Sequence, residues 1–154
     1  MKDLLYLDSS AIAKLVLDEP ESRALSAEIA NWSHLLSSAV AAIELQRAVG
    51  QLPDPLGRRR EATEQVLASI SLVPIRDRVV AEAASLGPPT LRIVDAIHLA
   101  TVLSITDGSL SVATYDDVLT DALRENGVTV IAPGMRHKPG KIASRPQGGR
   151  YLYS

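Results

Sequence analysis

The chain contains no cysteine, which excludes a disulfide framework and a thiolate metal site. This absence is typical of a protein in a reducing compartment. Phenylalanine is also missing and aromatic residues make up only 3% of the chain, so the core must be built from Ala, Leu, Val and Ile. An aromatic platform that stacks on nucleic-acid bases is therefore not expected.

Long apolar runs are absent as well. No stretch approaches the roughly 18 apolar residues that a membrane-spanning helix needs, and no signal peptide is recognisable. We therefore predict a soluble cytoplasmic protein with no membrane partner. The length of 154 residues fits one domain, and an apolar share of 46% is sufficient for a packed core.

Charge is distributed unevenly along the chain. Residues 135–154 hold five basic residues and no acidic one, whereas residues 1–134 hold 18 acidic and 11 basic residues. This division predicts a folded domain over residues 1–134 and a flexible basic tail over residues 135–154. We hypothesise that the tail adds non-specific affinity for RNA.

Short apolar runs alternate with segments of helical periodicity. The expected strands cover residues 4–7, 34–37, 72–75, 109–113 and 128–132, and the expected helices cover residues 11–17, 21–30, 39–49, 58–69, 78–86, 93–103 and 117–125. This alternation predicts a mostly parallel sheet with helices on both faces. Pro74 places the third strand at a sheet edge, because proline cannot donate to a strand ladder.

Four acidic residues stand out from this pattern. Asp8 and Asp116 follow the first and fourth strands, which is where open parallel sheets bind ligands. Glu44 and Asp95 lie within apolar helical segments, where a carboxylate is costly without a partner, hydrogen bonds or a metal. No lysine or arginine is evident beside the four. A divalent cation would suit such an all-oxygen set, and it could activate a water molecule for attack on a phosphodiester.

Each acidic residue also has an ordinary structural interpretation. Asp8 and Asp116 could cap the helices that follow them, and Glu44 could pair with Arg47 one helical turn later. The spacing of the four residues does not decide between these interpretations and a shared site.

Four segments, taken in order, give the sequence a resemblance to a known family. They are Tyr6-Leu7-Asp8-Ser9-Ser10-Ala11-Ile12-Ala13-Lys14-Leu15, Ser37-Ser38 through Ile43-Glu44-Leu45-Gln46-Arg47-Ala48, Val94-Asp95-Ala96-Ile97-His98-Leu99-Ala100-Thr101 and Ala113-Thr114-Tyr115-Asp116. The chain resembles a PIN-domain ribonuclease, specifically a VapC-type toxin of a VapBC toxin–antitoxin module. The match runs from about residue 4 to Pro133.

The resemblance implies a three-layer α/β/α domain with a five-stranded, mostly parallel sheet. It also implies endonucleolytic cleavage of RNA that depends on Mg²⁺ or Mn²⁺, a VapB-like antitoxin partner and a homodimer. By analogy the metal site consists of Asp8, Glu44, Asp95 and Asp116. Ser10 and Thr114 match hydroxyl positions that orient carboxylates, and Asp117 is a possible substitute for Asp116.

Several basic residues have both a functional and an ordinary interpretation. Lys14 and the run Arg58-Arg59-Arg60 are candidate contacts for RNA phosphates, although solvated side chains would look the same. His98 follows Asp95 by three residues, and a packed or surface histidine is the simpler expectation.

Three other classes of function stay open beside the ribonuclease. A phosphoaspartate hydrolase needs a second aspartate two residues after Asp8, where Ser10 stands. A receiver domain needs a lysine after the last strand, which Ala132-Pro133-Gly134 does not supply. A catalytically silent PIN-like module that binds RNA or protein is the main alternative, and a metal-dependent nuclease assay distinguishes it.

Overall fold

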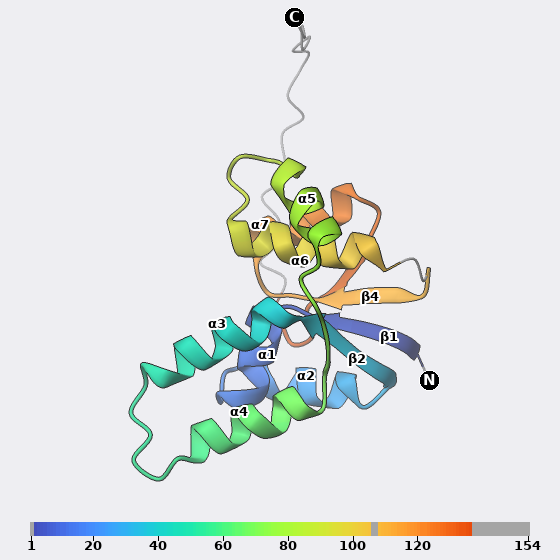
Figure 1. Cartoon of the computed structure of the whole chain (residues 1–154). Coiled ribbons are helices and arrows are strands. Elements are labelled where there is room, and N and C mark those ends of the chain that lie inside the picture. Colours follow the sequence, from blue (N-terminus) through green and yellow to red (C-terminus); the bar gives the residue numbers. More distant parts are fainter. Residues whose placement is uncertain (1, 106–107, 137–154) are drawn as a thin grey trace, which may run out of the picture.

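The computed structural model describes residues 2–105 and 108–136. Helices and strands alternate along these residues as the hydrophobic pattern predicts (Figure 1). In chain order they are β1 (Lys2–Leu7), α1 (Ser9–Val16), α2 (Ser22–Ile29), β2 (Trp32–Ser38), α3 (Ala39–Gly50), α4 (Arg58–Ala68), β3 (Ser71–Val73), α5 (Asp77–Ser85), α6 (Ile93–Ser104), β4 (Leu110–Ala113), α7 (Asp117–Glu125) and β5 (Thr129–Ile131).

The strands form one sheet in the order β3-β2-β1-β4-β5, and all four neighbouring pairs are parallel. The prediction of a five-stranded parallel sheet is therefore confirmed. β3 lies at an edge, as expected, and it ends at Val73 directly before Pro74. Proline lacks the backbone N–H that would continue the ladder, so the strand stops there.

Helices cover both faces of the sheet, which gives the predicted three layers (Figure 1). The central strand β1 shows why: alternate side chains of a strand point to opposite faces. Leu5 and Leu7 pack into a core with α1, α2, α3 and α4, while Tyr6 packs into a second core with α6 and α7. All three side chains are fully buried, so both faces of β1 stabilise the fold.

The first two strands begin earlier than predicted. β1 starts at Lys2 rather than Leu4, and β2 starts at Trp32 rather than His34. Lys2 and Trp32 are register partners, and the Lys2 ammonium also forms an ion pair with Glu28 at 2.8 Å. A polar residue therefore extends the strand because its neighbours in space, rather than its own propensity, fix its conformation.

None of the described helices is both long and apolar enough to cross a membrane. The structural description ends shortly after β5. Of the predicted basic tail, only Met135 and Arg136 belong to the described residues, and the remainder lies outside them.

Candidate active site

The sheet has a topological switch point between β1 and β4, because β2 and β3 extend it on one side and β4 and β5 on the other. Ligands of open parallel sheets bind beyond the carboxyl ends of the strands at such a point. Asp8 directly follows β1, and Asp116 lies three residues after the end of β4. The topology therefore brings two of the four predicted carboxylates to this edge.

Both aspartates also cap helices, so their ordinary interpretation is confirmed. Asp8 accepts a hydrogen bond from the backbone N–H of Ala11 in α1, and Asp116 accepts one from Leu119 in α7. The cap at Asp116 uses only Oδ1 and leaves Oδ2 for another partner. Capping and a role at the site are therefore compatible.

Asp8 is almost fully buried and is held by neutral donors. Its Oδ1 accepts hydrogen bonds from the Ser10 hydroxyl at 2.7 Å and the Ala11 N–H at 2.9 Å, and its Oδ2 accepts one from Thr114 Oγ1 at 2.5 Å. Burial raises the pKa of Asp8 above its usual value, although these hydrogen bonds act in the opposite direction. A cation beside this buried carboxylate would stabilise its charged form.

Ser10 and Thr114 join the β4–α7 connection to Asp8. The Ser10 hydroxyl accepts a hydrogen bond from the Tyr115 N–H at 3.0 Å, and Thr114 Oγ1 accepts one from the Asp116 N–H at 3.1 Å. Each hydroxyl donates to Asp8 at the same time. The two residues therefore fix the position of Asp116 relative to Asp8, which is the kind of orienting role predicted for them.

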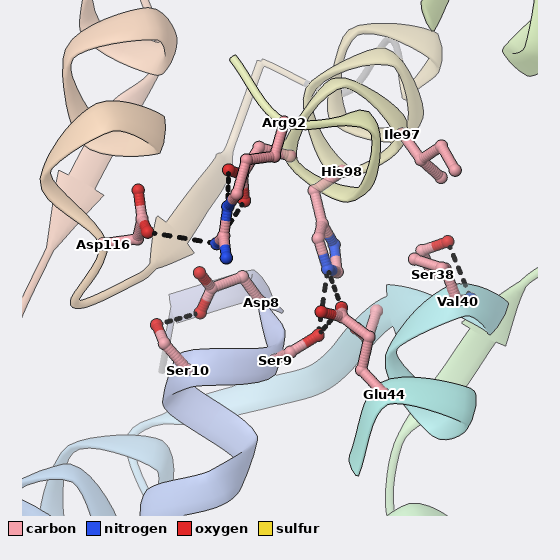
Figure 2. A network of polar contacts seen from close by, with 12 residues as sticks. Asp8, Ser9, Ser10, Ser38, Val40, Glu44, Arg92, Ile97, His98 and Asp116 are labelled. Carbon is pink, nitrogen blue, oxygen red and sulfur yellow. Dashed lines mark hydrogen bonds and ion pairs between the residues drawn. The ribbon is translucent and has the colours of Figure 1, made fainter. Parts of the chain in front are cut away.

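Asp95 lies in the first turn of α6 with its side chain 5% exposed, and its partner is Arg92. Arg92 Nε donates to Asp95 Oδ2 at 3.0 Å, and Nη2 lies 3.4 Å from both Asp95 Oδ1 and Asp116 Oδ2 (Figure 2). The hydrogen bond to Asp95 raises the pKa of Arg92. The expectation that no basic side chain accompanies the four carboxylates is therefore wrong.

Glu44, on α3, faces the same region from the other helical layer (Figure 2). It accepts a short hydrogen bond from the Ser9 hydroxyl, and His98 Nε2 lies 3.4 Å from its Oε1. Burial alone would raise the pKa of Glu44, but the hydrogen bonds from His98 and Ser9 hold it below the usual value. The suggested Glu44–Arg47 pair is not formed, because the carboxylate points toward α6 instead.

His98 is a buried polar residue with both ring nitrogens engaged. Nδ1 lies 2.7 Å from the Tyr6 hydroxyl, and Nε2 lies 3.1 Å from Ser9 Oγ. Burial raises the pKa of Tyr6, so its hydroxyl keeps its proton and can donate to Nδ1. If the hydroxyl donates there, Nε2 of the neutral ring carries the proton and donates toward Glu44. The simple expectation of a packed histidine is confirmed, and its polar contacts extend to the site.

Lys14 has a different environment from the one predicted. Its ammonium forms ion pairs with Glu19 at 2.6 Å and Glu21 at 2.9 Å, and it lies 4.7 Å from the centroid of the Tyr115 ring. The side chain is only 11% exposed. These contacts hold Lys14 to α2 and its preceding loop, and the structure does not bring it to the carboxylates.

The predicted Arg58-Arg59-Arg60 run is exposed at the start of α4. Its local partner is Asp54, whose carboxylate accepts hydrogen bonds from the backbone N–H groups of Arg59 and Arg60. This end of the α3–α4 hairpin points away from the sheet (Figure 1). The structure therefore separates the three arginines from the four carboxylates.

Three residues at the site were missed by the sequence reasoning: Tyr6, Ser9 and Arg92. Arg92 carried a usable signal, since residues three apart on a helix lie side by side and Asp95 is three residues later. Tyr6 and Ser9 carried none, because their contacts join residues far apart in the sequence.

The four carboxylates meet one requirement of a metal site but not the other. In residues 2–105 and 108–136, no three His, Asp or Glu side chains converge closely enough to hold an ion as they stand. Their donor chemistry nevertheless fits a divalent cation, because every candidate ligand is a hard carboxylate oxygen. Arg92 Nη2 already lies between Asp95 and Asp116, so these two carboxylates accommodate one positively charged group.

Comparison with known proteins identifies the family of this chain. The sequence model of the PIN domain matches residues 5–123. Ribonuclease VapC46 of Mycobacterium tuberculosis is 42% identical over 84% of this chain and 97% of that protein. The chain belongs to the VapC family of PIN-domain proteins. A second relative, Ribonuclease VapC47 of the same species, is 32% identical over 85% of this chain and 98% of that protein.

Solved structures share the VapC-family fold. FitAcB from Neisseria gonorrhoeae superposes with a TM-score of 0.63 at 21% identity, covering 84% of this chain and 97% of that one. VapBC-5 from M. tuberculosis, described as a toxin–antitoxin system, superposes with a TM-score of 0.58 at 20% identity, covering 84% and 98%. At these identities the likeness concerns the fold alone.

Proposed function

We propose that this chain is a metal-dependent endoribonuclease, the toxin of a toxin–antitoxin module, that hydrolyses RNA phosphodiester bonds in the cytoplasm. The observation that carries the proposal is the meeting of Asp8, Asp95 and Asp116 at the switch point of the sheet, where the last two share one cationic group. Relatives that bear the name ribonuclease and match 84% and 85% of this chain support the assignment.

Asp8 and Asp95 would be the primary ligands of a Mg²⁺ or Mn²⁺ ion, because they are the most buried carboxylates of the set. Asp116 and Glu44 would complete the site directly or through water. A bound divalent cation supplies an activated water and neutralises charge on the phosphodiester. The site would therefore need no nucleophilic side chain.

The surrounding residues have positioning roles in this proposal. Ser10 and Thr114 hold the Asp8 carboxylate in one orientation through neutral hydrogen bonds. Hydrogen bonds from Ser9 and His98 lower the pKa of Glu44, which favours the charged carboxylate that can accept a hydrogen bond from a water molecule. We keep Lys14 and Arg58-Arg59-Arg60 as proposed contacts for RNA phosphates away from the carboxylates.

A partner follows from the same proposal. Several structures of this fold are described as toxin–antitoxin complexes, and we propose that a VapB-like antitoxin binds over the acidic edge of this chain. A homodimer is the expected assembly. Co-purification with the product of a neighbouring short reading frame tests the first expectation, and light scattering tests the second.

The decisive experiment incubates the full chain with total RNA in Mg²⁺, in Mn²⁺ and in EDTA, and maps the cut ends. We expect discrete internal cuts with either metal and none in EDTA. The Asp95→Asn variant should not cut, whereas Asp18→Asn, which makes the same charge change at an exposed position, should cut like the wild type.

The alternative function is a catalytically silent module that binds RNA or protein. The Arg92 contact with two of the carboxylates favours it, since the described residues do not form a ready metal site. RNA that is bound but uncut in both metals would establish this alternative and reject the nuclease.

A further inference from the structure

Arg92 differs from the other members of the site because its side chain is exposed while the carboxylate it binds is buried. The side chain of Arg92 is 69% exposed, against 5% for Asp95 and 27% for Asp116. Arg92 directly precedes α6, and its side chain makes no capping hydrogen bond with that helix. Within the part of the chain that the structure describes, the side-chain hydrogen bonds of Arg92 are with Asp95 and Asp116, and its exposure allows the guanidinium to leave them without disturbing a core.

A single nitrogen of Arg92 joins two separate elements. Nη2 lies 3.4 Å from Asp95 Oδ1 on α6 and 3.4 Å from Asp116 Oδ2 at the start of α7, whereas Nε makes the shorter contact of 3.0 Å with Asp95. The contact with Asp116 is thus the weaker and more exposed of the two. A rearrangement of the site would break the Arg92–Asp116 contact before the Arg92–Asp95 contact.

A divalent cation would compete with this guanidinium for the two carboxylates. Mg²⁺ binds carboxylate oxygens at about 2.0–2.1 Å in near-octahedral geometry, and Asp95 Oδ1 and Asp116 Oδ2, which Nη2 now contacts, are among the oxygens it would take. Two positive groups beside one pair of carboxylates repel each other. Metal binding would therefore weaken the Arg92 contacts with these oxygens.

We propose that Arg92 is an exchangeable counter-cation, which joins Asp95 and Asp116 before metal binds and then moves to a phosphate oxygen of the RNA. The inference deepens the proposed function and rests on it. A guanidinium suits contact with the RNA because its forked N–H donors match the oxygens of a phosphate. Its Nε contact with Asp95 would keep the group within reach of the metal site.

The first test measures Mg²⁺ binding by calorimetry in the absence of RNA, with Arg92→Gln compared with wild type. Loss of the competing charge should tighten Mg²⁺ binding by several-fold. Arg78→Gln is the matched control, because Arg78 is exposed on α5 and makes no ion pair with the described residues. Unchanged or weaker binding by Arg92→Gln would overturn the exchange.

Thermal unfolding separates exchange from an ordinary structural role. In EDTA, Arg92→Gln should unfold at a lower temperature than wild type, because Asp95 and Asp116 lose their shared cation. Saturating Mg²⁺ should remove most of that difference. An arginine with only a structural role would lower the melting temperature equally in both conditions, and that result would reject the proposal.

The proposed contact between Arg92 and an RNA phosphate is tested with an RNA that carries a non-hydrolysable linkage, in saturating Mg²⁺. Arg92→Gln should bind it about tenfold more weakly, as expected for loss of a charged phosphate contact, and Arg92→Lys should recover part of the loss. Equal affinity of wild type and Arg92→Gln would show that Arg92 does not contact the phosphate.

The Asp95→Asn variant separates a failure of this inference from a failure of the proposed function. If Asp95→Asn binds Mg²⁺ as tightly as wild type, the carboxylates are not the metal site and the proposed function fails. If Asp95→Asn loses Mg²⁺ while Arg92→Gln binds it normally, the metal site stands and only the exchange is wrong.

Discussion

Helices α3 and α6 have the same length and a similar apolar sequence, and each carries one acidic residue of the site. The protein satisfies these two carboxylates differently. Glu44 on α3 stays 31% exposed and is held by hydrogen bonds with Ser9 and His98. Asp95 on α6 is 5% exposed and is held by the guanidinium of Arg92.

The difference indicates a division of roles within one site. The pKa of Glu44 is lowered mainly by its hydrogen bonds with His98 and Ser9, and the charge of Arg92 is a smaller contribution. Asp95 is as deeply buried as Asp8, but its partner is a cation rather than neutral donors, and this cation offsets the desolvation of its charge. A cation, whether guanidinium or metal, therefore belongs on the Asp8–Asp95–Asp116 side rather than beside Glu44.

The cation side of the site consists of Asp8, Asp95 and Asp116. The largest effect is expected from removing the negative charge of Asp8 or Asp95. Asp8→Asn or Asp95→Asn should lower kcat/KM for RNA cleavage by about 10³-fold or more, because a metal contributes several kcal/mol to the transition state. Steady-state cleavage of a defined RNA measures this loss, and circular dichroism checks that the fold survives. Normal cleavage by both variants would show that the active site lies elsewhere.

A smaller effect is expected on the Glu44 side. His98→Leu removes the hydrogen bond that lowers the pKa of Glu44, so the acidic limb of the pH–rate profile should move to higher pH. The variant should also lose about 1–3 kcal/mol of stability, because the buried Tyr6 hydroxyl loses its bond to Nδ1. Tyr6→Phe removes the hydroxyl and keeps the imidazole beside Glu44, so it measures the part of the stability loss that comes from the Tyr6 hydrogen bond. An unshifted profile for His98→Leu would mean that the histidine does not set the charge of Glu44.

Adjacent residues allow a finer test of which aspartate belongs to the cation side. Asp116→Asn should reduce cleavage by about tenfold, as expected for loss of a ligand or water contact, with little loss of stability because asparagine also caps helices well. Asp117→Asn should change neither quantity, because Asp117 is exposed and makes no ion pair within the described chain. Comparable losses for both variants would make Asp117 part of the site.

The smallest effect is a pH-dependent difference in stability. The pKa of Asp8 is raised in the folded, metal-free chain, so Asp8 favours folding at pH values below its unfolded pKa, and this contribution is lost as pH rises through its folded pKa. Asp8→Asn should therefore be more stable than wild type at neutral pH in EDTA, and the difference should shrink as pH falls. Urea unfolding of both proteins at several pH values measures it. A difference that does not change with pH would mean that Asp8 is not the titrating group.

The sequence predicted the elements well because their signals are local. Apolar runs bounded by Pro, Gly and capping residues located every strand and helix to within a few residues, and Pro74 correctly indicated an edge strand. The early starts of β1 and β2 were missed, since pairing of Lys2 with Trp32 depends on the neighbouring strand. Asp8 and Asp116 were found through a rule about parallel sheets rather than through any local signal.

The partners of the carboxylates were less predictable. The sequence showed that Glu44 and Asp95 each need a partner, because both sit among apolar residues. It did not show that one partner is His98 and the other Arg92. The Glu44–His98 contact spans 54 positions of the chain and the Arg92–Asp116 contact spans 24, so no local pattern encodes either.

The order of residues by itself therefore determined the sheet, its layers and the acidic character of one edge, because burial and hydrogen bonding act on short segments. Only the tertiary structure decided how each negative charge is balanced there. Electrostatic balance depends on distances of a few ångströms between side chains, and chain folding sets those distances after the segments have formed.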